Sequence, residues 1–286
     1  MEMSENKLLN LFFKIAITIG LAGIFMYLMQ EWIAALESEA YTVFIAIANI
    51  IGMFAIIVFI VRLFVTKHEM LIMNIAILLA AVYIFLYIFG HFFIPQYVGI
   101  SSSLSAFKDN NVNFVGVLVL CLLSIGVIVV FALRFTKRDQ FGIYEKFAVI
   151  LWVIALGIFT FASKLYFRVE EAFANVLDPF LGITFLPNMF EFIFILFIAI
   201  YLVFSFFVGV NEKILGLLQL LILNSVFLTF AIATTNIIGF DFPDNVYIFS
   251  IFGNIFVILG ALGLVVCTVF VLREKYPKSL AKRSKG

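Results

Sequence analysis

The seventh apolar stretch of the chain carries polar side chains whose types could bind a solute within a membrane. Gln219, Asn224 and Thr229 fall within residues 214–238, a run otherwise rich in Leu, Ile and Phe. In hydrocarbon, amide and hydroxyl groups hydrogen-bond across helices or face a polar cavity. We therefore expect these three residues to form a candidate polar cavity. Ordinary packing between helices is the competing interpretation.

Two ionisable residues form a second candidate. Lys164 lies near the end of the fifth apolar stretch and Glu191 near the start of the sixth. A charge at the centre of a bilayer costs about 2.5–3.5 kcal/mol on insertion scales, so such residues are usually paired. The order of the two residues predicts an ion pair across the connection. A role in transport or proton transfer is the alternative.

Acid–base chemistry is conceivable at Glu39, Glu171, Glu191 or His91, but it needs two such groups within reach of one substrate. The sequence contains no HExxH, GxSxG or P-loop motif, and Cys121 and Cys267 lie inside apolar stretches as small hydrophobes would. We therefore predict no catalytic, metal or cofactor site. A non-enzymatic role is favoured, and the net charge of +1 gives no case for binding nucleic acid.

The elements that must position these residues are membrane-spanning helices. Hydrophobic residues make up 65% of the 286-residue chain and charged residues 12%, and the apolar residues form long blocks. A helix needs about 20 apolar residues to cross a bilayer, and its backbone must be satisfied internally. The sequence predicts an all-α polytopic integral membrane protein, in contact with the lipid bilayer. Its eight helices are expected near 8–30, 42–63, 70–94, 112–135, 146–167, 189–210, 214–238 and 247–272.

Two short segments outside these spans also have helical spacing. Glu31–Glu37 contains Trp32, a residue suited to the headgroup region, and is long enough for a short interfacial helix, either as an ordinary solvated cap or with a role in admitting ligands. Residues 168–177 are similar, and Asp178-Pro179 is expected to end that segment.

The distribution of Lys and Arg predicts the orientation. Three of the 18 basic residues, namely Lys108, Lys164 and Arg168, fall on one side of the predicted spans, and the others fall on the opposite side. Basic residues accumulate on the cytoplasmic side. We therefore expect a multi-pass protein of the cell membrane with both termini in the cytoplasm.

Polar landmarks favour an internal repeat within one membrane domain. Its halves would be residues 1–140 and residues 141–286, the second ending in a basic cytoplasmic tail. The matching landmarks are Lys14 and Lys146, Glu39-Ala40 and Glu171-Ala172, and Glu69 and Glu212. Each half would have four helices, so the repeats would be parallel, with their axis along the membrane normal. Coincidence among eight similar helices is the alternative.

Small residues also predict where helices approach closely. The first span carries Ala16, Gly20 and Gly23 at helical spacing, and the last span carries Gly253, Gly260 and Gly263.

These features leave three functional hypotheses. The first is a carrier or channel-like protein for a small or lipophilic solute, because of the polar seventh span. The second is a non-catalytic subunit or scaffold that binds other membrane proteins. The third and least favoured is an intramembrane enzyme that acts on lipid.

Overall fold

The chain folds as a bundle of long helices. The computed structural model describes residues 7–36, 43–65, 67–90, 111–134, 141–161, 179–208, 212–237 and 247–275. The described helices are α1 (Lys7–Leu36), α2 (Val43–Phe64), α3 (Glu69–Ile88), α6 (Asn111–Arg134), α7 (Ile143–Thr160), α9 (Pro179–Val203), α10 (Glu212–Ile237) and α11 (Tyr247–Lys275). All eight are long and apolar enough to cross a membrane, which confirms the predicted all-α, eight-helix membrane fold.

Two helices are longer than the sequence patterns predict. Helix α1 continues through Leu36, so the segment from Glu31 to Leu36 is the last part of α1 and not a separate interfacial helix. Ala, Leu and Glu favour the helix, and no Gly or Pro interrupts it. Helix α9 begins at Pro179, ten residues before the predicted start at residue 189, and a π-type segment over Phe204–Val208 extends it. Proline fits the first turn of a helix, where its missing N–H is not needed.

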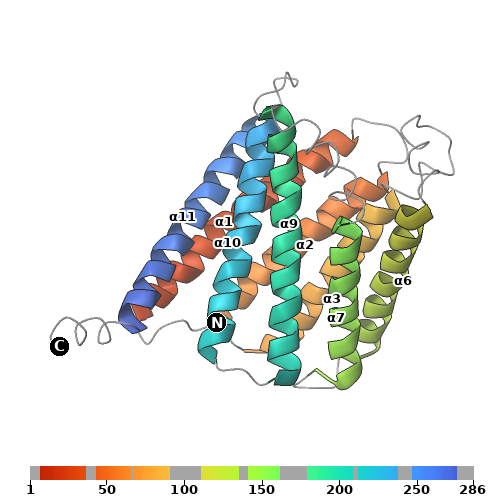
Figure 1. Ribbon diagram of the computed structural model, residues 1–286, viewed down its shortest axis with the longest axis horizontal. Coiled ribbons are helices and arrows are strands. Elements are labelled where there is room, and N and C mark those ends of the chain that lie inside the picture. Colours follow the sequence, from red (N-terminus) through yellow and green to blue (C-terminus); the bar gives the residue numbers. More distant parts are fainter. Residues whose placement is uncertain are drawn as a thin grey trace.

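The helices form a closed ring in chain order. Each described helix packs against the next one along the chain, and α11 packs against α1, which is the most extensive contact in the ring. Neighbouring helices run in opposite directions, so α1 begins and α11 ends at the same end of the bundle (Figure 1). The membrane face at which that end lies remains a prediction.

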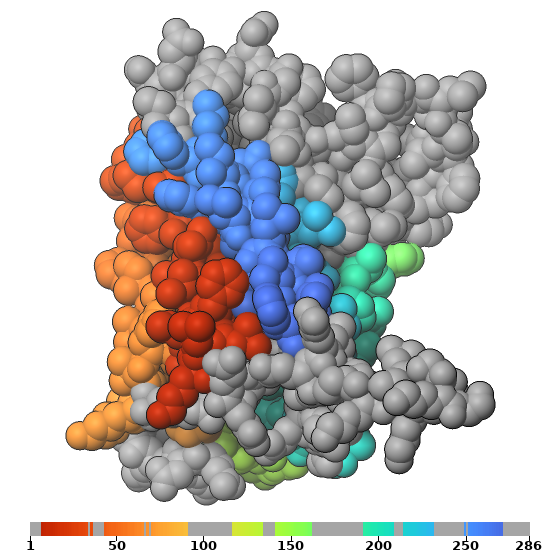
Figure 2. All heavy atoms as spheres, turned by 90° about the vertical axis from the view of Figure 1, so that its left-hand side faces the viewer, coloured from red at the N-terminus to blue at the C-terminus, as the bar shows by residue number. Residues whose placement is uncertain are grey.

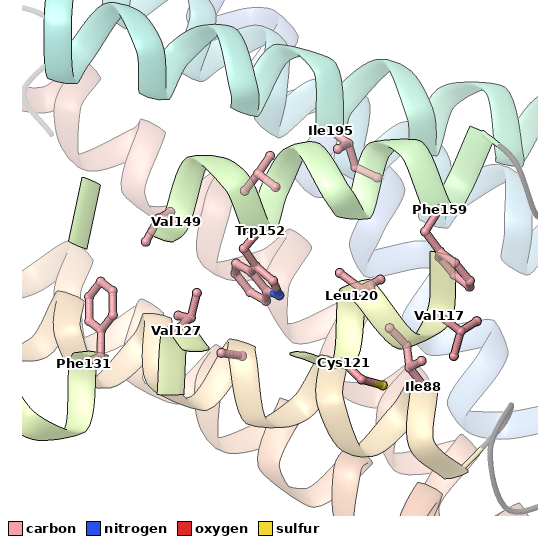
Figure 3. Close-up of a cluster of buried hydrophobic side chains, with 12 residues drawn as sticks. Ile88, Val117, Leu120, Cys121, Val127, Phe131, Val149, Trp152, Phe159 and Ile195 are labelled. Atoms are coloured by element: carbon pink, nitrogen blue, oxygen red, sulfur yellow. The ribbon is translucent and has the colours of Figure 1, made fainter. Parts of the chain in front are cut away.

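The buried apolar side chains form two main clusters on opposite parts of the ring. One cluster joins α3, α6, α7 and α9, with Leu120 and Trp152 near its centre (Figure 3). The other joins α1, α2, α10 and α11 around Phe13, Phe227 and Leu264. Each cluster takes two helices from residues 1–140 and two from residues 141–286. Each half therefore occupies one continuous part of the ring, the apolar clusters span the two boundaries between the halves, and the four-helix repeat stays a prediction.

Candidate functional site

The three residues predicted to line a polar cavity form hydrogen bonds with three different partners in the structure. The Gln219 Nε2 atom donates to the Tyr201 hydroxyl at 2.7 Å, which links α10 to α9. Asn224 Nδ2 donates to the backbone oxygen of Leu220 at 2.9 Å, within the same helix. Thr229 Oγ1 likewise donates to the Ser225 carbonyl at 2.8 Å, and its side chain is buried. A shared cavity at these residues remains a prediction.

The predicted ion pair has one partner within the described residues. Lys164 lies outside them, as do His91, Glu39 and Glu171. Glu191 is placed on α9, where its Oε1 atom lies 3.5 Å from the donating hydroxyl of buried Thr160 on α7. Because α9 begins at Pro179, Glu191 lies about 18 Å from the first residue of the helix, measured along its axis, and not at its start.

Glu191 is linked to two tyrosines on α3, and these tyrosines are linked in turn to a polar pair on α1. Tyr27 and Glu31 on α1 are hydrogen-bonded to each other through their side chains. Tyr83 and Tyr87 on α3 have ring centroids 5.8 Å apart, and both interact electrostatically with Glu31 and with Glu191. We call Tyr27, Glu31, Tyr83, Tyr87 and Glu191 the interior polar cluster.

The ring order places this cluster inside the bundle. Helix α1 packs against α2 and α11, α3 against α2 and α6, and α9 against α7 and α10. None of α1, α3 and α9 is a ring neighbour of another, so the interactions of Tyr83 and Tyr87 with Glu31 and Glu191 run across the ring. The ring is narrow at this level, since Tyr27 also contacts Phe230 of α10 edge-to-face, with centroids 5.8 Å apart.

Asn49 is a buried amide on α2, the helix that packs between α1 and α3 in the ring. A Cβ added to Gly52 would lie 3.0 Å from Leu28 of α1 and 3.0 Å from Tyr83 of α3, so this face of α2 looks toward both helices. Further along, Ile45 packs with Ala35. Since α1 and α2 are antiparallel, Asn49, one turn from Gly52 on the same face, is level with Glu31.

The Asn49 side chain is 1% exposed, and neither its nitrogen nor its oxygen has a hydrogen-bond partner among the residues that the structure describes. An unpaired buried polar group costs about 1–3 kcal/mol, and one inside a membrane calls for a ligand, a water molecule or another polar group. The unpaired amide therefore marks a place where a polar group is needed.

The chemistry of the cluster follows from its side chains. Two carboxylates accept hydrogen bonds and carry negative charge when ionised, and three phenols offer hydroxyl groups and electron-rich ring faces. The amide of Asn49 can both donate and accept. Within the described residues, no group of three or more His, Cys, Asp and Glu side chains could hold a metal ion. The cluster is suited to binding a polar or charged small molecule.

The sequence patterns missed most of this cluster. Tyr27 and Glu31 are four residues apart, as are Tyr83 and Tyr87, and this spacing places each pair on one helix face. That spacing was a visible signal. The sequence could not show that the two faces point at each other and at Glu191.

Comparison with protein-family models, with curated proteins and with solved structures finds no match for this chain. The class of the protein rests on its own helices, and they define a multi-pass membrane protein.

Proposed function

We propose that the protein is a carrier or channel-like protein for a small solute, which enters the helix ring and binds at the interior polar cluster. The observation that supports this proposal best is that Glu31 of α1 and Glu191 of α9 both act electrostatically on Tyr83 and Tyr87 of α3, although these three helices are not ring neighbours. Ionisable groups inside a membrane protein typically mark solute or ion pathways.

The position of the cluster between the two apolar clusters adds support. Tyr27 and Glu31 belong to α1, in the cluster of α1, α2, α10 and α11. Tyr83, Tyr87 and Glu191 belong to α3 and α9, in the other cluster. A relative movement of the two groups of helices would open and close the site between them, as alternating access requires.

The role of a non-catalytic subunit remains the alternative. In such a protein the interior polar cluster would serve only as hydrogen bonds between helices. The two roles differ in whether water reaches the cluster, because a solute pathway must be hydrated for at least part of the time.

Water access can be measured by thiol labelling of the Tyr87→Cys variant. Both native cysteines are first replaced, by Cys121→Ala and Cys267→Ala, so that the new thiol alone reacts. Tyr87 is the most exposed member of the cluster, at 36%. The reagent is a small, charged methanethiosulfonate applied to the full chain in lipid nanodiscs. We expect labelling at least ten times faster than at Leu120→Cys, a site whose native side chain is 0% exposed.

A second control is Leu122→Cys, on the exposed apolar surface of α6, where we expect lipid to suppress the reactive thiolate. Labelling of Tyr87→Cys no faster than at both controls would overturn the proposed function. It would favour the role of a subunit.

A further inference from the structure

The beginning of α7 and the end of α9 combine a lysine with aromatic rings. Both lie at the end of the bundle where α1 begins (Figure 1). The Lys146 ammonium nitrogen lies over the Phe206 ring, 5.5 Å from its centroid. Beside it, Phe147 of α7 contacts Phe207 of the π-type segment that extends α9, with ring centroids 5.2 Å apart. We call Lys146, Phe147, Phe206 and Phe207 the α7–α9 patch.

The aromatic part of this patch is continuous with the outer surface of the ring. Phe147 is 50% exposed and Phe207 45%. Further exposed apolar side chains follow along α7 at Ile143, Leu151 and Ile154. With Phe147 they recur every three or four residues, so they form one stripe on the helix. Because α7 is a candidate membrane span, this stripe is suited to contact with acyl chains.

Lys146 lies beside the stripe, on the side of α7 that faces α9. It precedes Gly157 by about three turns, and a Cβ added to Gly157 would lie 3.3 Å from Ile195 of α9. Its side chain is partly exposed, in the first turn of the helix and at the edge of the span. Lysines at the ends of spans extend to the headgroup region, where the lipid phosphates lie.

The ammonium group of Lys146 has hydrogen-bond donors for an anion. Among the residues that the structure describes, it contacts the Phe206 ring and forms no ion pair. The carboxylate of Glu145 is 5% exposed and lies about 100° around the helix from Lys146. The ring covers one side of the ammonium group, which carries three N–H donors. An anionic group arriving from the membrane would therefore meet a positive charge.

Other basic residues belong to the same end of the bundle. Helix α6 ends at Arg134, and Lys213 is the second residue of α10. The sequence places all but three of the 18 basic residues on this side of the predicted spans. Basic sites between membrane helices bind anionic lipid headgroups.

We propose that the α7–α9 patch binds an anionic phospholipid of the phosphatidylglycerol type. The Lys146 ammonium group binds the phosphate, the Phe206 ring holds the ammonium group in place, and an acyl chain lies against Phe147 and Phe207. A zwitterionic lipid has the same phosphate, but its own cationic group offsets the attraction to Lys146. The site is on the outside of the ring and does not depend on the proposed carrier function.

Native mass spectrometry of the purified full chain can measure this selectivity. The detergent micelles contain equal amounts of palmitoyloleoyl phosphatidylglycerol and palmitoyloleoyl phosphatidylcholine, which have the same acyl chains. We expect at least five times more bound phosphatidylglycerol than phosphatidylcholine. Lys146→Gln should lower this ratio at least threefold, whereas Lys146→Arg keeps the charge and should preserve the ratio.

Lys7→Gln is the matched control, because Lys7 is an exposed lysine at the same end of the bundle, on α1. It should leave the ratio unchanged. If Lys146→Gln does not fold, Phe206→Leu removes the ring under the ammonium group and should lower the ratio at least twofold.

A ratio near one in the native chain would overturn the proposal, as would an unchanged ratio in Lys146→Gln or Phe206→Leu. An equal loss in Lys7→Gln would also overturn it, by showing attraction to the whole basic end. Displacement of the bound lipid by millimolar inorganic phosphate would assign the site to a soluble anion instead. The labelling rate of Tyr87→Cys enters none of these results, so the carrier proposal stands or fails separately.

Discussion

Two contacts between neighbouring helices in the ring are built in different ways. Where α1 meets α11, the backbones touch: a Cβ added to Gly260 would lie 2.6 Å from the Gly20 Cα atom, and one added to Gly23 would lie 2.5 Å from the Gly253 carbonyl. Figure 2 shows α11 crossing α1 on this face of the molecule. The close approach predicted from the small residues of both spans is confirmed.

Where α6 meets α7, side chains separate the helices. Val117, Leu120 and Cys121 of α6 form a cluster with Trp152 of α7 (Figure 3). The indole Nε1 of Trp152 donates a hydrogen bond of 2.9 Å to the Ser124 hydroxyl. The glycines of α6 play no part, since a Cβ at Gly116 or Gly126 would meet nothing within 4 Å.

The comparison shows two ways in which helices of this protein hold together in a bilayer. Lipid tails are as apolar as Leu, so helices in a bilayer associate through dispersion contacts and hydrogen bonds. The α1–α11 contact uses backbone proximity, which a single methyl group would disturb. The α6–α7 contact uses interlocking side chains and one hydrogen bond. We therefore expect substitutions there to lower the free energy of unfolding less, and by amounts that depend on how much of the side chain is removed.

The largest difference should follow from Gly260→Val. The added side chain would collide with the backbone of Gly20, which has no flexible end to move away. We expect a loss of about 3 kcal/mol in the free energy of unfolding. The measurement is SDS titration of the full chain in mixed micelles. Gly126→Val is the matched control and should change stability by less than about 1 kcal/mol.

A smaller effect is expected at the α6–α7 contact from Trp152→Phe. This change removes the indole N–H and part of a side chain that is 6% exposed. The expected loss is about 2 kcal/mol by the same titration, since a cavity adds to the lost bond. A loss as large as that of Gly260→Val would remove the contrast between the two contacts.

The hydrogen bond at that contact can be tested on its own. Ser124→Ala leaves the buried indole N–H of Trp152 without its partner, and we expect a loss of about 1 kcal/mol. Ser124→Ala in the Trp152→Phe background should cost less, because no donor is then left unpaired. Equal losses in both backgrounds would argue against the bond.

The smallest expected effect concerns the pairing of Gln219 with Tyr201, which links α9 and α10. A double-mutant cycle of Gln219→Leu and Tyr201→Phe should give a coupling of about 0.6 kcal/mol, the average for such bonds in a bilayer. Coupling above about 2 kcal/mol would instead indicate that the pair belongs to a larger polar network, as a cavity around Gln219 would require.

The positions of the helices followed from the sequence because the bilayer imposes strict requirements on length and composition. The exceptions have local causes: nothing in the Glu31–Leu36 segment ends α1, and Pro179 begins a helix although a proline can equally end one.

The partners of each helix face did not follow from the sequence. The glycines of α1 predict a surface of close approach, but only the fold identifies α11 as the helix they meet. The interior polar cluster depends on the ring in the same way. Glu31 and Glu191 are far apart in the chain, and closure of the ring brings them near the same two tyrosines.

The closure of α1 on α11 also has a consequence for biosynthesis. Among the described helices α1 is translated first and α11 last, so the most extensive contact of the ring cannot form until α11 has been made. Until then the bare glycine surface of α1 must face lipid, the insertion machinery or a temporary partner helix. A truncated chain that lacks α11 would leave this glycine surface without the helix that covers it.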